Sequence, residues 1–376
     1  MRGNITRRGK SSWRLKFDVG EDKGKRLIRY VTMRGKRADA EAELARLLND
    51  AHKGTLVDPT KITLGDYLRS WLDSKTDVTN VTRERYLEII KNRIDPVLGE
   101  IELQKLKPKH VQDWLSHLIK KGARRAPGGL GPRTVRHCYR VLWSALKQAV
   151  KLEMLSRNVA DAATPPRLKD DEVEILMPEQ IMAVREALKG SRLGPIVNLG
   201  LATGCRMGEL LSLRWRDLEG NTLTIERSLE QTKAGLRFKS PKTKHGRRKI
   251  TLPPSAVLDL DKHRREQLEL RMRLGLGKSP ADALGFCNDD GSPLAPGKIS
   301  VQWNRVIRRI PGVSPVTFHS FRHCHASALI KAGVDVVSVS RRLGHSSPVI
   351  TLKVYAHLFG DASQDKAAEA IERMLK

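Results

Sequence analysis

The sequence predicts a multidomain, mainly α-helical protein with small antiparallel β-sheets. Apolar and polar residues alternate near the N-terminus and again around residues 222–252, whereas most of the remaining chain places leucines and aromatics at helical spacing. The length of 376 residues suggests two or three domains at about 150 residues each. Linkers containing proline divide the chain into three predicted domains, residues 1–57, 62–162 and 172–376.

The first block is predicted to be a small α+β module. Residues 13–19 alternate like a half-buried strand, residues 27–33 form a second strand candidate, and residues 4–7 are a weaker candidate for a third. Residues 38–51 follow as a helix with leucines on one face. A basic sheet backed by a helix can lay strands in a DNA major groove, although a packing domain with a charged outer face fits the same pattern.

The second block is predicted to be helical. Thr63 is an expected N-cap for a helix over residues 64–74, and Thr82 is expected to open a second helix through Lys91. Proline at the first position marks two further helices, residues 108–120 and 132–152. Short basic helices without a catalytic cluster indicate either a DNA clamp or a plain helical interaction domain.

The third block contains the residues that can carry chemistry. Its periodicity predicts helices, then three short strands, then helices to the C-terminus. The expected helices cover residues 178–189, 195–202 and 206–213, and the expected strands lie near residues 222–228, 236–240 and 247–252.

The composition favours a nucleic acid as the partner. Lys and Arg number 70 against 42 Asp and Glu, which gives a formal net charge of +28. Such a charge attracts polyanions, although ribosomal or chaperone-like basic proteins share it. The basic residues are spread along the chain, which favours several modules that each contact a phosphate backbone. The four cysteines form no C-x-x-C pair, and no apolar run reaches the ~20 residues of a membrane helix, so neither a disulfide framework nor a membrane partner is expected.

Two clusters in the third block suit phosphate chemistry. Arg206 follows Gly204 at a predicted helix start, and Glu209 shares its face, so the acid can orient the guanidinium. Most such pairs are surface ion pairs, so this cluster alone is weak. In the second cluster, His319 and Arg322 stand three positions apart on one predicted helix face. A further histidine, His345, follows after a turn, and ten residues later comes Tyr355.

This order of residues resembles the tyrosine recombinases, in particular phage-type integrases. The family pattern of Arg, Lys, His-x-x-Arg, His and Tyr is matched in chain order by Arg206, Lys242, His319 with Arg322, His345 and Tyr355. The resemblance covers the second and third blocks well. The first block is more loosely similar to the arm-binding domain of heterobivalent integrases, followed by a core-binding and a catalytic domain.

The resemblance implies site-specific DNA cleavage and rejoining through a 3′-phosphotyrosyl bond at Tyr355, without ATP, cofactor or metal. Arg206 and Arg322 would stabilise the charge on the phosphorane. Lys242 would protonate the leaving 5′-oxygen, with Lys244 as the alternative. His319 would assist proton transfer and His345 would donate to the phosphate, while Glu209 would orient an arginine.

The resemblance also implies partners. We expect double-stranded DNA with core-type and arm-type sites, a homotetramer on DNA, and optionally an excisionase and a host DNA-bending protein, in a bacterial cytoplasm and on the nucleoid. The amphipathic tail, residues 361–376, is expected to pack in trans on a neighbouring subunit, although packing on its own core fits nearly as well.

Four other interpretations compete with this one. A zinc site at His319, His323 and Cys324-His325 lacks the H-E-x-x-H spacing. Gly277-Lys278-Ser279 resembles the end of a P-loop but lacks the preceding glycine. A non-catalytic DNA-binding regulator accounts for residues 334–358 as a helix-turn-helix, but not for Arg206 and Lys242. A type IB topoisomerase shares the chemistry and would relax supercoils without a paired-site product.

Overall fold

The structure is a computed structural model of the chain. It divides into two compact units, Met1–Lys169 and Asp170–Lys376. The predicted class, mainly helical with small antiparallel sheets, is confirmed. The structure describes residues 3–22, 25–52, 56–57, 59–122, 128–168, 174–241, 244–356 and 371–375.

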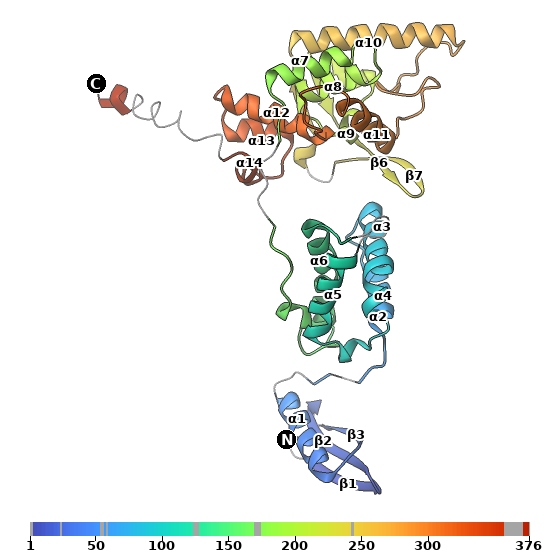
Figure 1. The fold of residues 1–376 in the computed structure, drawn as a ribbon, viewed down its shortest axis with the longest axis vertical. Helices are drawn as coiled ribbons and strands as arrows, with labels where there is room; N and C mark the ends of the chain where they lie inside the picture. Colours follow the sequence, from blue (N-terminus) through green and yellow to red (C-terminus); the bar gives the residue numbers. More distant parts are fainter. Residues whose placement is uncertain are drawn as a thin grey trace. The chain divides into compact units, whose positions relative to one another are not determined.

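The N-terminal part of the first unit is an antiparallel sheet covered by a helix (Figure 1). Its elements are β1 Gly3–Gly9, β2 Ser12–Asp22, β3 Lys25–Arg34 and α1 Arg37–His52. The third strand, expected weakly at residues 4–7, is therefore present as β1. Leu15 and Phe17 on β2 pack against Leu44 and Leu47 on α1. Strand alternation thus commits one face of the sheet to the helix.

The opposite face of this sheet is polar and basic. Leu15 pairs with Ile5 and Val31 on the covered face, so the adjacent Arg14 and Lys16 point the other way. Tyr30 pairs with Lys16 and is exposed, and the Arg14 guanidinium lies 5.1 Å from its ring centroid. The module therefore presents cations and an aromatic ring on an uncovered sheet surface.

The remainder of the first unit is a helical module with its own core. Its helices are α2 Leu64–Ser74, α3 Asn80–Ile89, η1 Ile90–Ile94, α4 Asp95–Leu98, η2 Leu103–Lys105, α5 Pro108–Lys121, α6 Pro132–Lys151 and η3 Val159–Ala162. Thr63 caps α2 as predicted, since its hydroxyl accepts from the Asp66 backbone N–H. The expected start at Thr82 was wrong: Thr79 is the cap of α3, and its hydroxyl accepts from the N–H of Thr82.

Helix α6 has one apolar and one basic face. Its buried positions belong to the core shared with α2 and α5. Arg133, Arg136 and Arg140 follow at helical spacing on the exposed side. These arginines form a basic stripe along one helix.

The second unit contains the residues of the predicted site. Its helices are α7 Pro178–Ala187, α8 Leu193–Thr203, α9 Met207–Leu210, η4 Trp215–Asp217, η5 Lys244–Gly246, α10 Pro254–Arg273, α11 Pro296–Ile307, α12 Phe318–Lys331, α13 Val336–Leu343 and α14 Pro348–Tyr355. Its strands are β4 Leu218–Glu219, β5 Thr222–Ile225, β6 Ser228–Thr232, β7 Gly235–Lys239 and β8 Arg248–Thr251.

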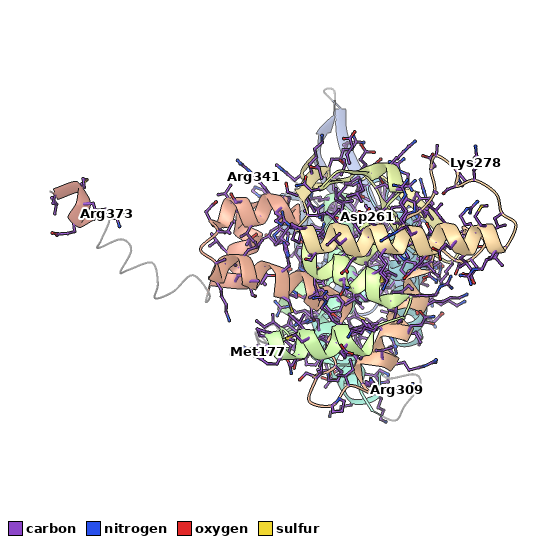
Figure 2. The ribbon with its side chains drawn as sticks, turned by 90° about the horizontal axis from the view of Figure 1, so that it is seen from above. Met177, Asp261, Lys278, Arg309, Arg341 and Arg373 are labelled. Atoms are coloured by element: carbon purple, nitrogen blue, oxygen red, sulfur yellow. The ribbon has the colours of Figure 1, made fainter. Side chains whose placement is uncertain are left out.

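Helix α8 runs through the core of this unit. Because it is apolar nearly all round, it packs against both α12 and α10. Strands β4, β5 and β8 form one small sheet, and β6 with β7 forms a separate hairpin. Figure 2 shows α10 lying along the surface of the unit, with Asp261 on the helix and Lys278 in the loop beyond it. The helix expected over residues 206–213 is shorter, because α9 ends at Leu210.

Within the described residues, no helix is both long and apolar enough to cross a membrane. Most of the predicted C-terminal tail lies outside the described residues. Its helical turn at residues 371–375 exposes Ile371 and Met374.

Candidate active site

The site begins where α8 ends. Gly204 terminates the helix in the left-handed conformation, with φ of 64°. A Cβ atom there would lie 2.8 Å from Leu343 Cδ2 and 2.9 Å from His325 Cδ2, so a larger residue would push α8 away from α12 and α13. The glycine therefore brings Arg206 close to the segments that carry the later motifs.

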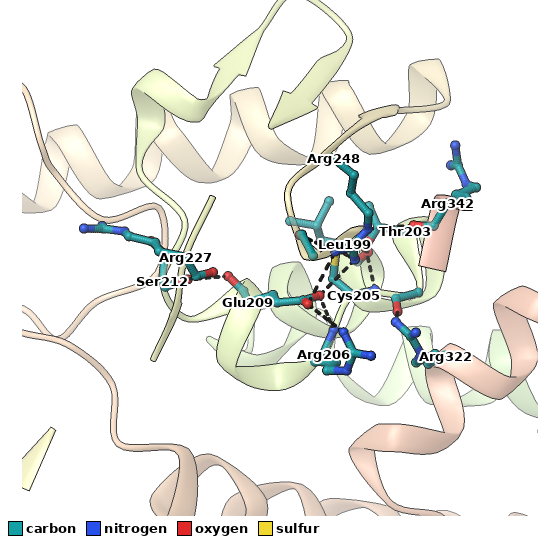
Figure 3. Close-up of polar contacts among 12 residues, drawn as sticks. Leu199, Thr203, Cys205, Arg206, Glu209, Ser212, Arg227, Arg248, Arg322 and Arg342 are labelled. Carbon is teal, nitrogen blue, oxygen red and sulfur yellow. Dashed lines mark hydrogen bonds and ion pairs between the residues drawn. The ribbon is translucent and has the colours of Figure 1, made fainter. Parts of the chain in front are cut away.

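Arg206 and Glu209 form a reciprocal pair at the start of α9 (Figure 3). The Arg206 backbone N–H donates to Glu209 Oε2 at 3.0 Å, and Arg206 Nη1 donates to Oε1 at 2.9 Å. The carboxylate side chain is only 5% exposed, whereas that of Arg206 is 44% exposed. The predicted orienting role of Glu209 thus has a geometric basis: a buried acid holds an arginine that faces outward.

A second arginine, Arg248 on β8, binds the same carboxylate from the inner side. Arg248 Nη2 donates to Glu209 Oε2 at 2.9 Å, and its side chain is 6% exposed. Burial raises the pKa of Glu209, but the combined effect of Arg248 and then Arg206 lowers it by more. The net shift of the pKa is downward, so the acid is ionised. No local sequence pattern singled out Arg248.

Arg322 lies inside α12 and retains an unused donor. It is 2% exposed, and its Nη1 donates to the carbonyl oxygen of Gly204 at 3.0 Å. Its Nη2 is buried without a hydrogen-bond partner among the described residues. Burial, followed by the charge of Arg206, lowers the pKa of Arg322 to about 10. A buried guanidinium with an unpaired N–H donor costs free energy, and a bound anion that accepts from this donor lowers that cost.

The two predicted histidines adjoin these arginines. Partial desolvation, then Arg322 and Arg206, lowers the pKa of His319. Burial, then the same arginines, lowers the pKa of His345 to about 4. His345 Nδ1 shares a hydrogen bond of 2.8 Å with the hydroxyl of buried Thr351. Both rings are therefore neutral at pH 7. That the charges of Arg322 and Arg206 lower the two pKa values indicates that these four side chains lie close together.

Tyr355 ends α14 and is 2% exposed. Its hydroxyl shares a hydrogen bond of 2.6 Å with His323 Nδ1. Burial raises the pKa of Tyr355 to about 12, which the charge of Arg322 opposes. From sequence, His323 was a candidate only for zinc binding, although it follows Arg322 directly and stands one turn from His319.

The predicted general acid cannot be placed, because Lys242 lies outside the described residues. The alternative, Lys244, begins the short helix η5, which leads into β8. The structure thus brings together Arg206, Glu209, His319, Arg322, His345 and Tyr355, but gives no position for Lys242.

The zinc alternative finds no support in the geometry. His323 is bonded to Tyr355, the Cys324 thiol accepts from the Leu176 N–H, and His325 Nδ1 is bonded to the Leu201 carbonyl. Among the described residues, no group of three or more histidine, cysteine or acidic side chains is arranged to hold a metal ion.

The electrostatic balance of the site is positive. Three arginines, Arg206, Arg248 and Arg322, converge on the end of α8, and the carboxylate that contacts the first two is Glu209. Such a cluster can hold an anion such as a phosphodiester and stabilise additional charge on it. The phenol of Tyr355 and the neutral imidazoles lie beside this anion site.

The chain belongs to the phage integrase family. The family model described as "Phage integrase family" matches residues 166–361. A second model, "Phage integrase, N-terminal SAM-like domain", matches residues 63–119. The protein is accordingly a tyrosine recombinase, a member of the class of enzymes that break and rejoin DNA strands.

Similar proteins include mobile-element integrases. A "Tyrosine recombinase XerC-like" protein of Caldanaerobacter subterraneus subsp. tengcongensis is 29% identical and aligns over 94% of each chain. The Tn1549 transposon integrase, solved with circular intermediate DNA, has a TM-score of 0.68 at 18% identity and covers 83% of this chain and 99% of its own. A lambda integrase tetramer on a Holliday junction has a TM-score of 0.56 at 19% identity and covers 93% of this chain and 97% of its own.

Proposed function

We propose that this recombinase integrates or excises a mobile element by cutting DNA through a covalent bond between Tyr355 and a 3′-phosphate. The observation that carries the proposal is the buried Arg322, whose Nη2 has no hydrogen-bond partner among the described residues. It lies in a cluster with more arginines than acids. The scissile phosphate supplies the anion that this donor lacks. The phenol of Tyr355 lies close enough for Arg322 to affect its pKa.

The arginines act on the phosphate. Arg322 Nη2 and the exposed guanidinium of Arg206 donate to the non-bridging oxygens, and the neutral His345 adds a third donor. The negative charge increases as the phosphorane forms, so these bonds strengthen in the transition state. Each such donor contributes about 10²–10³-fold to the rate of cleavage.

The nucleophile needs activation, because burial raises the pKa of Tyr355 to about 12. Its oxygen attacks phosphorus and forms the phosphotyrosyl ester, while the bond to the 5′-oxygen breaks. The tyrosyl proton passes to Nδ1 of His323, which shares a hydrogen bond with the hydroxyl, and His319 assists this transfer. Lys242, or else Lys244, gives a proton to the leaving 5′-oxygen. The ester conserves the bond energy, so attack by a 5′-hydroxyl reverses the step without ATP.

The two parts of the first unit bind DNA but take no part in the cleavage reaction. We assign residues 1–57 to arm-type sites, because the uncovered face of the sheet carries Arg14, Lys16 and Tyr30. Residues 62–162 bind core-type sites through the arginine stripe on α6. Residues 172–376 form the catalytic domain. Binding by either module depends on phosphate contacts and weakens as salt rises.

Strand exchange takes place in a homotetramer that holds two DNA sites. The lambda integrase tetramer has the same fold, which supports this assembly. The tail packs on a neighbouring subunit through apolar positions such as Ile371 and Met374, which are exposed in the single chain. An excisionase and a host DNA-bending protein direct the reaction through arm-type DNA.

The test is covalent capture on a suicide substrate. A nicked duplex containing one end of the source element is incubated with wild-type protein and with Tyr355→Phe, and adducts are resolved after denaturation. Wild type is expected to form a stable protein–DNA adduct, and Tyr355→Phe none, since the variant lacks the attacking oxygen. Equal DNA binding by both proteins is the control.

The outcomes separate the alternatives. Tight binding without an adduct, where an established recombinase forms one, contradicts the catalytic proposal and favours a DNA-binding regulator. An adduct accompanied by relaxation of supercoiled DNA, without a product from paired sites, favours a type IB topoisomerase.

A further inference from the structure

Arg248 links three segments of the site. Its Nε donates to the carbonyl oxygen of Arg342 at 2.7 Å, and its Nη1 donates to that of Gly246 at 3.2 Å. The remaining side of the guanidinium faces Glu209, with Nη2 at 2.9 Å from Oε2 and Nη1 at 3.4 Å from Oε1. One rigid guanidinium therefore joins β8 to Glu209 on α9 and to the end of α13.

The turn that carries His345 is shaped around this guanidinium. A Cβ at Gly344 would lie 2.9 Å from Arg248 Nη1 and 3.0 Å from the carbonyl oxygen of His245. Gly344 also has φ of 70°, which L side chains rarely adopt. The turn thus approaches Arg248 closely because Gly344 has no side chain. The position of Arg248 therefore fixes the backbone position of the next residue, His345.

Charge gives Arg248 a second effect. Glu209 alone would neutralise Arg206, because both of its oxygens accept from that residue. Arg248 binds the same two oxygens from the buried side. With Arg248 in place, the charges of Arg206, Arg248 and Glu209 sum to a net positive charge. This charge is accessible at the exposed guanidinium of Arg206.

We propose that Arg248 is a positioning residue of this active site. It compensates the charge of Glu209 so that Arg206 meets the scissile phosphate as an uncompensated cation, and it fixes the His345 turn against the same carboxylate. The proposal rests on the proposed cleavage chemistry, but assigns a part to a residue outside the family's motif.

The experiment compares two substrates. Arg248→Gln is tested on the suicide substrate and on the same DNA with a neutral methylphosphonate at the scissile position. Removing one negative oxygen reduces the need for cationic stabilisation. We expect cleavage of the phosphodiester to slow about 10–100-fold with DNA affinity unchanged within about twofold, and the deficit to shrink at least about fivefold on the methylphosphonate.

Arg214→Gln is the matched control, because Arg214, like Arg248, is a buried arginine bonded to a buried acid, in its case Asp217. It should show no deficit that depends on the substrate. Arg248→Lys keeps the charge but not the fork, so it should cleave faster than Arg248→Gln and slower than wild type; it serves as the test if the Gln variant does not fold. An equal deficit of Arg248→Gln on both substrates, or a loss confined to DNA affinity, would overturn the proposal.

Wild type and Tyr355→Phe are run alongside. If wild type forms no adduct, the proposed function itself fails. If wild type reacts and Arg248→Gln cleaves as fast as wild type, only the positioning role fails.

Discussion

Two arginines in the second unit have nearly the same local geometry. Arg206 and Arg214 each precede a short helix and each donate a backbone N–H to an acid three residues ahead, at 3.0 Å to Glu209 and 2.9 Å to Asp217. Each guanidinium also binds that acid. In sequence the two appear as R-x-x-E and R-x-x-D, only a few residues apart.

They differ in the balance of charge around them. Arg214 is 9% exposed and also donates to Glu226 at 3.0 Å, with Asp282, which pairs with Arg216 as well, at 3.9 Å. Three acids therefore lie near its guanidinium. Around Arg206 the proportion is reversed, since Glu209 is shared with Arg248. A saturated arginine holds the fold together, whereas an uncompensated one can bind a substrate anion.

The largest effect is expected from Arg206→Gln. Its guanidinium faces the proposed phosphate, so adduct formation should slow about 10²–10³-fold. Stability should change by less than about 1 kcal/mol, because the side chain is half-exposed and Glu209 keeps Arg248. Rates from the suicide substrate and urea unfolding check the two parts. A large loss of stability would mean that Arg206 is structural after all.

The next largest effect is expected at Arg214, where stability should fall and activity should not. Arg214→Gln leaves the buried carboxylate of Asp217 without its partner, which should cost roughly 3 kcal/mol of unfolding free energy. The adduct rate per folded molecule should match wild type. Arg216→Gln is the control, because its pair with Asp282 is exposed and should contribute under about 1 kcal/mol. A normal stability for Arg214→Gln would remove the distinction between the two arginines.

The smallest effect concerns pH and the junction of α8, α12 and α13, where His325 lies. His325 Nε2 accepts from Arg342 Nε at 3.0 Å, so its Nδ1–H donates to the Leu201 carbonyl. Burial, then Arg342 and Arg322, lowers the pKa of His325 to about 4, whereas an unfolded histidine titrates near ~6.5. Between these values the unfolded chain binds more protons, so stability falls as the pH decreases from about 6.5 to 4.

His325→Gln removes this titration. Between pH 7 and pH 5, wild type should lose about 1–2 kcal/mol more unfolding free energy than the variant. Urea unfolding at the two pH values measures the difference. Parallel losses in both proteins would show that His325 does not contribute to the acid sensitivity.

Local patterns predicted most of the helices and less of the site. The proline-marked helices begin at Pro108 and Pro132 as expected, since a proline at the first turn is a strong start signal. Two threonines in the same turn were harder to separate. Thr79 and Thr82 are three residues apart, and only the turn geometry determines which one caps α3.

The residues missed at the site act through tertiary contacts. Arg248 contacts Glu209 across 39 positions of sequence, and the flanking R-R-K run predicts nothing beyond a charged strand. A signal did exist for His323, which stands four residues after His319 and adjoins Arg322. Its contact with Tyr355 depends on how α14 packs on α12, which no local pattern specifies.

The burial of Tyr355 has a consequence for handling the protein in solution. Its phenol is 2% exposed and bonded to His323, whereas Tyr30 on the first sheet is 55% exposed. A tyrosine-nitrating reagent is therefore expected to modify Tyr30 well before it modifies Tyr355, the proposed nucleophile. Burial thus shields the proposed nucleophile in the DNA-free protein, and a preparation nitrated at its exposed tyrosines is expected to keep Tyr355 unmodified.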